Sequence, residues 1–308
     1  MALPVRLLAF ALVLVACLAR PAGACEMARL ATVPLMLADG RILVDLEING
    51  RDATFQLDTG AARSVVTPEA VRRLELARDR WVGSTIGGIG GIDRRSVADT
   101  TSLTLAGIAL HHRDGPRDSM LPVAVLGAPE AGGRIIDGLL GRDFLSAFDV
   151  ALNVGARTMT LWRVQDCAGR FLPRTGVWSG AYDAIQAAPA YGDALVLMVR
   201  ANGAVMRALP DTGASETLIA APGMVRLGLA AGPSAMTARG IGTRARPVAP
   251  LRLSSLRVGE QTTLDVPVLA SNLRVFPIVD MLLGADWFAK HHVWLSYATR
   301  QVFVSPAN

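Results

Sequence analysis

An internal repeat constrains the fold of this chain more than any other feature of its sequence. When the 308-residue sequence is shifted by 153 positions, Phe55–Val66 matches Ala208–Ile219 without a gap, and both segments contain Asp-Thr-Gly. A shift of 143 positions places Leu139–Phe144 on Leu282–Trp287 in the same way. A repeat of this length corresponds to a whole domain, because solenoid repeats are only about 20–45 residues long. The chain is therefore predicted to contain two homologous lobes.

Each half has the sequence texture of a β domain. Short apolar runs alternate with turns, and in both halves an Asn-Gly pair, at 49–50 and at 202–203, separates two such runs as in a β-hairpin. Short helices are predicted at 142–147 and 285–290, each after a Leu-Leu-Gly segment. We therefore expect an all-β protein of two related β-barrel lobes with short helices. The predicted strands are 42–48, 53–57, 102–105, 123–126, 150–154, 158–162, 195–199, 205–209, 251–253, 264–269, 293–296 and 301–304.

The first 24 residues have the composition of an export signal. They contain no acid, one early base and an apolar run over 7–16, which is shorter than the about 20 residues of a membrane-spanning helix. Ala22–Ala24 is a small-x-small cleavage site that would leave Cys25 first, so we expect an exported protein, periplasmic or secreted. The alternative is a lipoprotein anchored through Cys17, because Leu14–Cys17 resembles a bacterial lipobox.

The repeat and the signal together divide the chain into four parts. We predict a signal peptide over 1–24 and an N-terminal lobe over 25–165. An inter-lobe segment over 166–190 contains two prolines and several glycines, and a C-terminal lobe covers 191–308. We expect the chain to be a monomer.

The net charge of +5 does not indicate a nucleic-acid-binding protein. Removal of residues 1–24 deletes Arg6 and Arg20 and no acid, which lowers the net charge to +3. The remaining bases form no tract longer than a pair and have no aromatic residues between them. A nucleic-acid-binding surface needs clustered bases. We therefore predict no nucleic-acid partner.

Two cysteines, Cys25 and Cys167, remain once the signal and Cys17 are set aside. An oxidising compartment favours their pairing, which would link the mature N-terminus to the end of the first half. The alternative is two unpaired buried thiols. The four histidines form adjacent pairs, at 111–112 and 291–292, rather than pairs at helical spacing, so no metal site and no cofactor are predicted.

The two Asp-Thr-Gly triplets, at 58–60 and 211–213, carry the chemistry of the chain. The glycine lets the backbone turn sharply at the end of an apolar strand, so that the aspartate projects from the turn. The threonine hydroxyl can tie two such turns together. Pseudo-two-fold packing of the lobes would place Asp58 and Asp211 a few ångströms apart, where two carboxyl groups share one proton.

These motifs resemble those of the pepsin/retropepsin superfamily of aspartic peptidases. Both halves show Asp-Thr-Gly-Ala, then two apolar residues, a Gly-rich segment and apolar-apolar-Gly-x-Asp. The lobes look retropepsin-like, because Ala61 and Ala214 follow the glycine where pepsins usually carry Ser or Thr. The resemblance implies a bilobal pepsin-like acid-protease fold with the substrate cleft between the lobes.

The resemblance also implies roles for individual residues. The ionised aspartate of the pair would take a proton from a water that attacks the scissile carbonyl, and the protonated one would donate to the carbonyl oxygen. The implied partner is a peptide or protein substrate. The implied residues are the catalytic pair Asp58 and Asp211, the interlocking Thr59 and Thr212, the turn glycines Gly60 and Gly213, and Gly141 and Gly284 behind the two turns.

Two glycine-rich segments, Ser84–Ile92 and Ala238–Thr243, are expected to cover the cleft as flaps. They do not form a phosphate-binding loop, because no lysine or helix start follows them. The alternative is a pair of mobile surface hairpins without substrate contact. The candidate flap residues are Gly88, Ile89, Gly90, Gly240, Ile241 and Gly242.

Two departures from the repeat lie beside the second triplet. Pro210 replaces Leu57, so the second aspartate follows a residue without an N–H; it either marks a strand edge or shifts Asp211. Glu216 adds a carboxylate where the first half has Arg63.

The leading hypothesis for the function is an exported aspartic endopeptidase. The alternative is a catalytically weak or inactive retropepsin-like protein that binds peptides in the cell envelope; retention of both triplets favours the enzyme.

Overall fold

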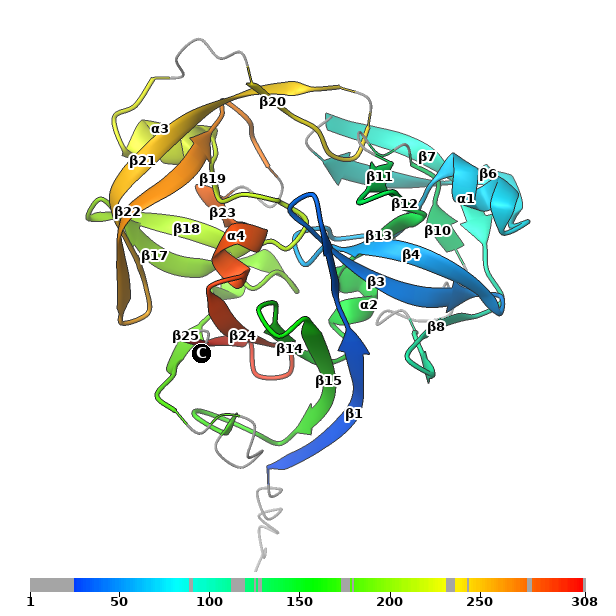
Figure 1. The fold of residues 1–308 in the computed structure, drawn as a ribbon, viewed down its shortest axis with the longest axis horizontal. Helices are drawn as coiled ribbons and strands as arrows, with labels where there is room; N and C mark the ends of the chain where they lie inside the picture. The colour runs from blue at the N-terminus through cyan, green and yellow to red at the C-terminus, as the bar shows by residue number, and fades with distance from the viewer. Residues whose placement is uncertain are drawn as a thin grey trace, which may run out of the picture.

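The strands of the computed structural model form two lobes and one sheet that both lobes share (Figure 1). The structure describes residues 25–88, 91–111, 120–124, 126, 129–172, 178, 180–230, 236–242, 244–275 and 279–306. In Figure 1 the N-terminal lobe lies on the right, the C-terminal lobe on the left, and the shared sheet below them. This arrangement confirms the prediction of a two-lobe, all-β fold with short helices.

The shared sheet has six strands in the order β1-β15-β14-β24-β25-β16, so three strands of the first half lie side by side and continue into three strands that follow residue 180. Its central pair joins the halves, since Val150 of β14 lies opposite Leu295 of β24. The strand bounds are β1 (Glu26–Pro34), β14 (Asp149–Asn153), β15 (Thr158–Gln165), β16 (Asp183–Gln186), β24 (His291–Ser296) and β25 (Gln301–Pro306).

The N-terminal lobe contains a seven-stranded sheet, a three-stranded sheet and a two-stranded sheet. Its strand β3 shows why the sequence folds this way: Val44, Leu46 and Ile48 are buried, whereas Asp45 and Glu47 between them are exposed. The elements are β2 (Met36–Ala38), β3 (Arg41–Ile48), β4 (Arg51–Leu57), β5 (Val65–Val66), α1 (Pro68–Arg73), β6 (Ala77–Gly88), β7 (Gly91–Asp99), β8 (Leu103–Leu105), β9 (Ile108–Ala109), β10 (Met120–Pro122), β11 (Glu130–Ala131), β12 (Arg134–Ile135), β13 (Gly138–Leu140) and α2 (Arg142–Leu145).

The C-terminal lobe is a closed barrel of six strands, because β17 pairs with β18 on one side and with β21 on the other. Closure removes the sheet edges that would otherwise expose unpaired backbone groups. The elements are η2, a 3-10 helix (Pro189–Tyr191), β17 (Leu197–Ala201), β18 (Ala204–Pro210), β19 (Leu218–Ile219), α3 (Ala221–Arg226), β20 (Met236–Ala238), β21 (Arg246–Val258), β22 (Gln261–Ala270), β23 (Met281–Leu283) and α4 (Ala285–Phe288).

The two lobes repeat the same strand register. In the first, β4 and β13 are parallel with Gly138 opposite Phe55; in the second, β18 and β23 are parallel with Met281 opposite Ala208. Both pairs of positions are related by the shifts of 153 and 143 residues found in the sequence. The sequence repeat is therefore a repeat of three-dimensional structure.

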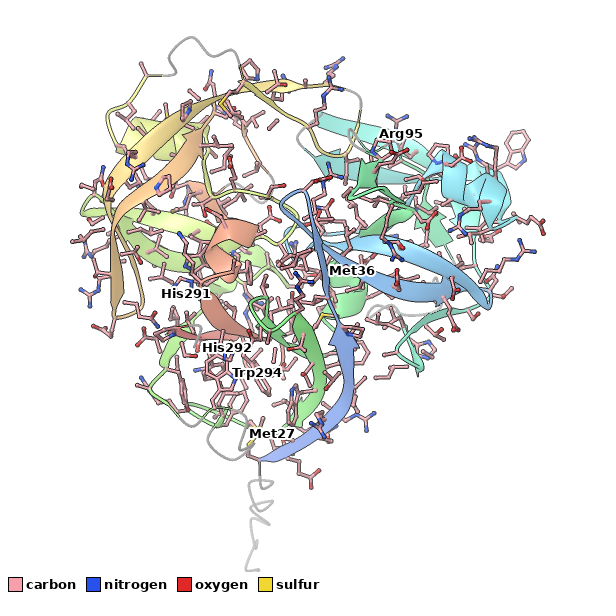
Figure 2. All side chains as sticks on the ribbon, in the orientation of Figure 1. Met27, Met36, Arg95, His291, His292 and Trp294 are labelled. Carbon is pink, nitrogen blue, oxygen red and sulfur yellow. A yellow bond between two sulfur atoms is a disulfide. The ribbon has the colours of Figure 1, made fainter. Side chains whose placement is uncertain are left out.

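A disulfide joins Cys25 to Cys167 beside the outer edge of the shared sheet, as the cysteine count predicted. The two residues flank the paired strands β1 and β15, in which Glu26 lies opposite Gln165. A cluster of buried aromatic side chains packs nearby, and Trp294 and Met27 mark this lower part of the molecule in Figure 2. The buried aromatics of the cluster are Trp162, Phe171, Trp178, Tyr182, Trp294 and Phe303.

The structure corrects two details of the predicted strands. A strand over 123–126 is wrong, because Val123 and Leu126 form only isolated bridges, to Val66 and to Ile241. This segment crosses between partners instead of running along one of them. The segment over 166–190 contains strand β16, which pairs with β25 in the shared sheet. Among the described residues, no helix is both long and apolar enough to cross a membrane.

Candidate active site

Two equivalent loops place Asp58 and Asp211 at the ends of β4 and β18. Each aspartate N–H donates to the last residue of the neighbouring parallel strand: that of Asp58 to the Leu140 carbonyl at 3.0 Å, and that of Asp211 to the Leu283 carbonyl at 2.8 Å. The strand pairing therefore fixes each loop relative to its own lobe.

Thr59 and Thr212 connect the two loops across the lobe boundary with four hydrogen bonds. The Thr59 hydroxyl donates to the Pro210 carbonyl at 2.9 Å and accepts from the Thr212 N–H at 3.1 Å. The Thr212 hydroxyl donates to the Leu57 carbonyl at 2.8 Å and accepts from the Thr59 N–H at 3.0 Å. Both threonines are buried, with exposed fractions of 2% and 0%. The hydroxyl and the N–H of both threonines therefore all have partners in the opposite loop.

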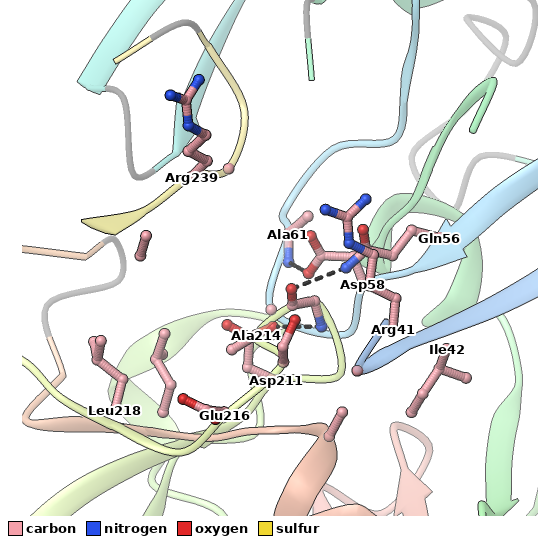
Figure 3. A pocket seen from close by; sticks show the side chains of 18 of the residues that line it. Arg41, Ile42, Gln56, Asp58, Ala61, Asp211, Ala214, Glu216, Leu218 and Arg239 are labelled. Carbon is pink, nitrogen blue, oxygen red and sulfur yellow. Dashed lines mark hydrogen bonds between the residues drawn. The ribbon is translucent and has the colours of Figure 1, made fainter. Parts of the chain in front are cut away.

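Asp58 and Asp211 lie close enough for each to affect the pKa of the other, and each carboxyl group lies against the glycine of the opposite triplet. Each also accepts from its own loop: Asp58 from the Ala61 N–H at 2.7 Å, and Asp211 from the Gly213 N–H at 2.9 Å (Figure 3). Both carboxyl groups are thereby held in one orientation toward the cleft.

The two carboxyl groups differ in acidity. Burial and then the negative charge of Asp58 raise the pKa of Asp211 to about 8. Burial also raises the pKa of Asp58, but hydrogen bonds from Ala61 and Asp211 and the positive charge of Arg142 oppose that rise. The pair therefore shares one proton between its two titrations, and Asp211 is the carboxyl group that holds this proton more strongly.

Gly60 and Gly213 allow this close approach. A Cβ atom on Gly60 would lie 2.3 Å from the carboxyl carbon of Asp211, and one on Gly213 would lie 2.3 Å from that of Asp58. No side chain fits at either position without displacing an aspartate, so each triplet requires its glycine because of the other lobe's carboxyl group.

Gly141 and Gly284 lie behind the two loops. A Cβ atom would lie 2.9 Å from the Ala61 carbonyl oxygen in the first case and 2.4 Å from the Glu216 carbonyl carbon in the second. The helix that follows each glycine supplies a second brace: Asp143 accepts from the Ser64 N–H and hydroxyl, and Asp286 accepts from those of Thr217.

The structure resolves both departures from the repeat. Pro210 ends β18 in register with Leu283, and the following N–H of Asp211 keeps its bond to the sheet, so the proline does not shift the aspartate. What the loop uses at this position is the carbonyl, which accepts from Thr59. Glu216 is exposed and lines the cleft without joining the carboxyl pair.

A cleft of about 890 Å³ contains both aspartates. Its floor carries pseudo-symmetric apolar pairs such as Leu139 with Leu282. Besides the two aspartates, its charged lining residues are Asp39, Arg41, Glu216, Arg239 and Asp286. Figure 3 shows Arg239 on the far side of the cleft from the two aspartates. Burial lowers the pKa of the half-buried Arg41.

Segments of both lobes meet at the rim of the cleft. Gly88, at the end of β6, lies so close to Ile241 that an added Cβ would be 3.0 Å from the isoleucine Cβ. Ile241 also bridges Leu126 and packs against the apolar cluster of the N-terminal lobe. Gly88, Gly240 and Ile241 line the cleft, whereas Gly242 does not belong to its lining. Ile89 and Gly90 lie outside the described residues.

Among the polar residues of the site that sequence reasoning missed are Arg41 and Gln56, which line the cleft, and Arg142, which contacts an active-site loop. Each departs from the internal repeat, since the matching positions hold Ala194, Leu209 and Ala285. Comparison of the two halves position by position would have found them. Among the described residues, no group of three or more His, Cys, Asp or Glu is placed to hold a metal ion.

A protein built from two such lobes, with paired Asp-Thr-Gly loops at one cleft, has the architecture of an aspartic protease. A family model described as aspartyl protease matches residues 44–144 and 197–287, which cover both lobes and both triplets. The chain therefore belongs to the aspartyl protease family. No curated protein is similar enough to this sequence to count as a match.

Proposed function

We propose that this protein is an aspartic endopeptidase that hydrolyses peptide bonds with Asp58 and Asp211. The observation that supports this most strongly is the close pair of carboxyl groups in the cleft, which have unequal acidity and are each held by a loop N–H. Such a pair provides a base and an acid at the same pH, which is what general acid–base hydrolysis needs.

In the proposed reaction, Asp58 and Asp211 each transfer protons in a fixed order. Ionised Asp58 accepts a proton from a water bound between the carboxyl groups, and the water oxygen attacks the scissile carbonyl carbon. Protonated Asp211 donates its proton to the carbonyl oxygen, giving a neutral tetrahedral diol. The carbon–nitrogen bond then breaks as the leaving nitrogen takes a proton from Asp58 and Asp211 regains one from the diol. The pair returns to its starting protonation state.

A peptide library tests this function directly. We expect the purified protein to cleave internal bonds of peptides, with one oxygen from ¹⁸O-labelled water in the new carboxyl group. A peptide analogue with a hydroxyl group at the scissile carbon should inhibit, because it mimics the diol. A protein that binds this analogue and cleaves no peptide would instead be the peptide-binding scaffold named above as the alternative.

The pH dependence of the reaction follows from the two aspartates. Activity requires Asp211 protonated and Asp58 ionised. The pKa of Asp211 is raised to about 8, so kcat/KM should fall as the pH rises through about 8. The pKa of Asp58 is also raised, so the acid limb should lie above the ordinary aspartate value of about 3.9. A pH–rate profile that has its maximum near pH 3 would contradict this prediction.

The charge of the cleft predicts a preference among peptides. Arg41 is half-buried in the cleft wall, where Asp39 already offsets part of its desolvation and a carboxylate of the substrate would offset more of it. We expect peptides with an acidic residue near the cut to be preferred over their amide analogues, and Arg41→Gln to reduce this preference by about tenfold. Arg134→Gln, on the surface beside Asp45, is the matched control and should leave the preference unchanged.

We also propose that the protein is exported and monomeric, with the lobe boundaries given above. The Cys25–Cys167 disulfide supports export, because such bonds persist in oxidising compartments. Residues 1–24, including Cys17, lie outside the described residues. Partitioning of the expressed protein into detergent, with Cys17→Ala for comparison, separates a lipid-anchored form from a periplasmic or secreted one.

A further inference from the structure

Arg142 is a buried cation directly behind the first active-site loop. It begins α2, its side chain is 3% exposed, and its Nη1 atom donates to the Thr59 carbonyl at 3.1 Å and the Gly60 carbonyl at 2.5 Å. These carbonyls belong to the residues that follow Asp58. The guanidinium therefore holds the backbone of this loop and places a positive charge close to Asp58.

The second lobe has no such cation at the matching place. The repeat puts Ala285, whose side chain carries no charge and no donor, where Arg142 stands at the start of its helix. The carbonyl of Gly213, the counterpart of Gly60, accepts instead from the Gln56 amide at 2.9 Å. The two loops thus have similar hydrogen bonding, but a charged donor serves the loop of Asp58 and a neutral donor serves the loop of Asp211.

The other titratable groups around Arg142 do not cancel the positive charge that it places beside the loop of Asp58. From the C-terminal lobe, Asp193 lies 3.6 Å from the Arg142 Nε atom and is 39% exposed, so solvent screens part of its charge and it offsets the charge of Arg142 only in part. Tyr297 is buried, and burial raises the pKa of its hydroxyl, which stays neutral. Farther into the shared sheet, burial raises the pKa of Asp149. The group that faces Asp58 from the opposite side is Asp211.

We infer that Arg142 is a positioning residue that fixes the polarity of the carboxyl pair, keeping Asp58 as the base and Asp211 as the acid. An unmodified two-fold pair could place its proton on either side. Because the cation lies on one side only, Asp58 accepts the proton of the attacking water and Asp211 protonates the scissile carbonyl oxygen in every turnover. The catalytic part of this inference rests on the proposed function. The unequal acidity of the two carboxyl groups does not, because it is a property of the protein without substrate.

Titration of the aspartate carboxyl carbons by ¹³C NMR tests the polarity without turnover, with Asp58→Asn and Asp211→Asn to assign the two signals. In the wild type Asp58 should titrate at a lower pH than Asp211. Arg142→Gln keeps donors for the loop carbonyls but removes the charge, and should raise the titration midpoint of Asp58 by about one pH unit. Arg142→Lys, which restores the charge, should return the midpoint to the wild-type value. Arg134→Gln, which removes a surface cation, is the control and should change neither midpoint.

The outcomes separate this inference from the proposed function. If Arg142→Gln leaves the midpoint of Asp58 unchanged, or if Arg142→Lys shifts it as far as Arg142→Gln does, the inference is wrong. If the glutamine variant does not fold, Asp193→Asn takes its place and should lower the midpoint of Asp58, because it removes the anion that offsets Arg142; no shift overturns the inference. A wild type that shows separate midpoints but cleaves no peptide would refute the endopeptidase and leave the polarity standing. In an active enzyme, the acid limb of kcat/KM should move up with Arg142→Gln while the alkaline limb stays in place.

Discussion

Replacement of either Asp58 or Asp211 by asparagine is expected to lower kcat/KM by at least about 10³-fold. An amide cannot accept the proton of the attacking water at position 58, and it cannot deliver a proton to the carbonyl oxygen at position 211. The shape of the side chain is almost unchanged, so the loops and their threonine hydrogen bonds should persist. Initial rates on one cleaved peptide, measured near neutral pH, give the comparison.

A matched control variant and the pH dependence of stability show whether the loss of activity in the asparagine variants comes from the missing carboxyl group or from unfolding. Glu216→Gln removes a carboxylate that lines the cleft outside the pair, and should change kcat/KM only a few-fold. The pKa of Asp211 is higher in the folded than in the unfolded state, so its contribution to stability is complete below about pH 4 and is lost as the pH rises through about 8. Asp211→Asn should therefore lose less stability than the wild type over this range. Activity that survives either asparagine variant would contradict the proposed mechanism.

The carboxyl pair could be predicted from the sequence because it depends on a duplicated motif. Two copies of Asp-Thr-Gly at the same register require two equivalent loops, and the hydroxyls of Thr59 and Thr212 have partners only if the loops meet. The hairpins around Asn-Gly follow from local turn chemistry in the same way. Local patterns and the repeat were therefore sufficient for the fold class and for the two aspartates.

The shared sheet could not be predicted in the same way, because its pairings join residues far apart in the sequence. Nothing in the pattern of Glu26–Pro34 shows that it pairs with the strand at 158–165, and the pairing of Val150 with Leu295 joins the two halves.

Some polar residues of the site could not be predicted from the sequence for a different reason. Arg142 looks like an ordinary first-turn residue of a short helix, and its role appears only when the Thr59 and Gly60 carbonyls lie next to it. The repeat reveals such a residue through its mismatch with Ala285.

The glycines of the two triplets give the second large expected effect. Gly60→Ala should lower kcat by about 10²-fold or more, because the new methyl group would lie 2.3 Å from the carboxyl carbon and from one oxygen of Asp211. A contact this short forces the carboxyl group to move, and a displacement of about 1 Å at a reacting group costs about 10²-fold in rate. Gly213→Ala should act equally on Asp58, where the carboxyl carbon would also be 2.3 Å away.

The expected loss of activity comes from a clash with the aspartate of the opposite lobe and not from strain in the backbone of the substituted glycine. Neither glycine has a positive φ, so alanine is compatible with the local backbone and the conflict is with the opposite lobe alone. Gly180→Ala is the matched control, since a Cβ there meets nothing within 4 Å and its φ is likewise not positive, and it should preserve activity and stability. In the ¹³C titration, Gly60→Ala should change the signal of Asp211 more than that of Asp58, and Gly213→Ala should do the reverse. Wild-type activity in both variants would show that the carboxyl groups are not held at the distance on which the proposed hydrolysis depends.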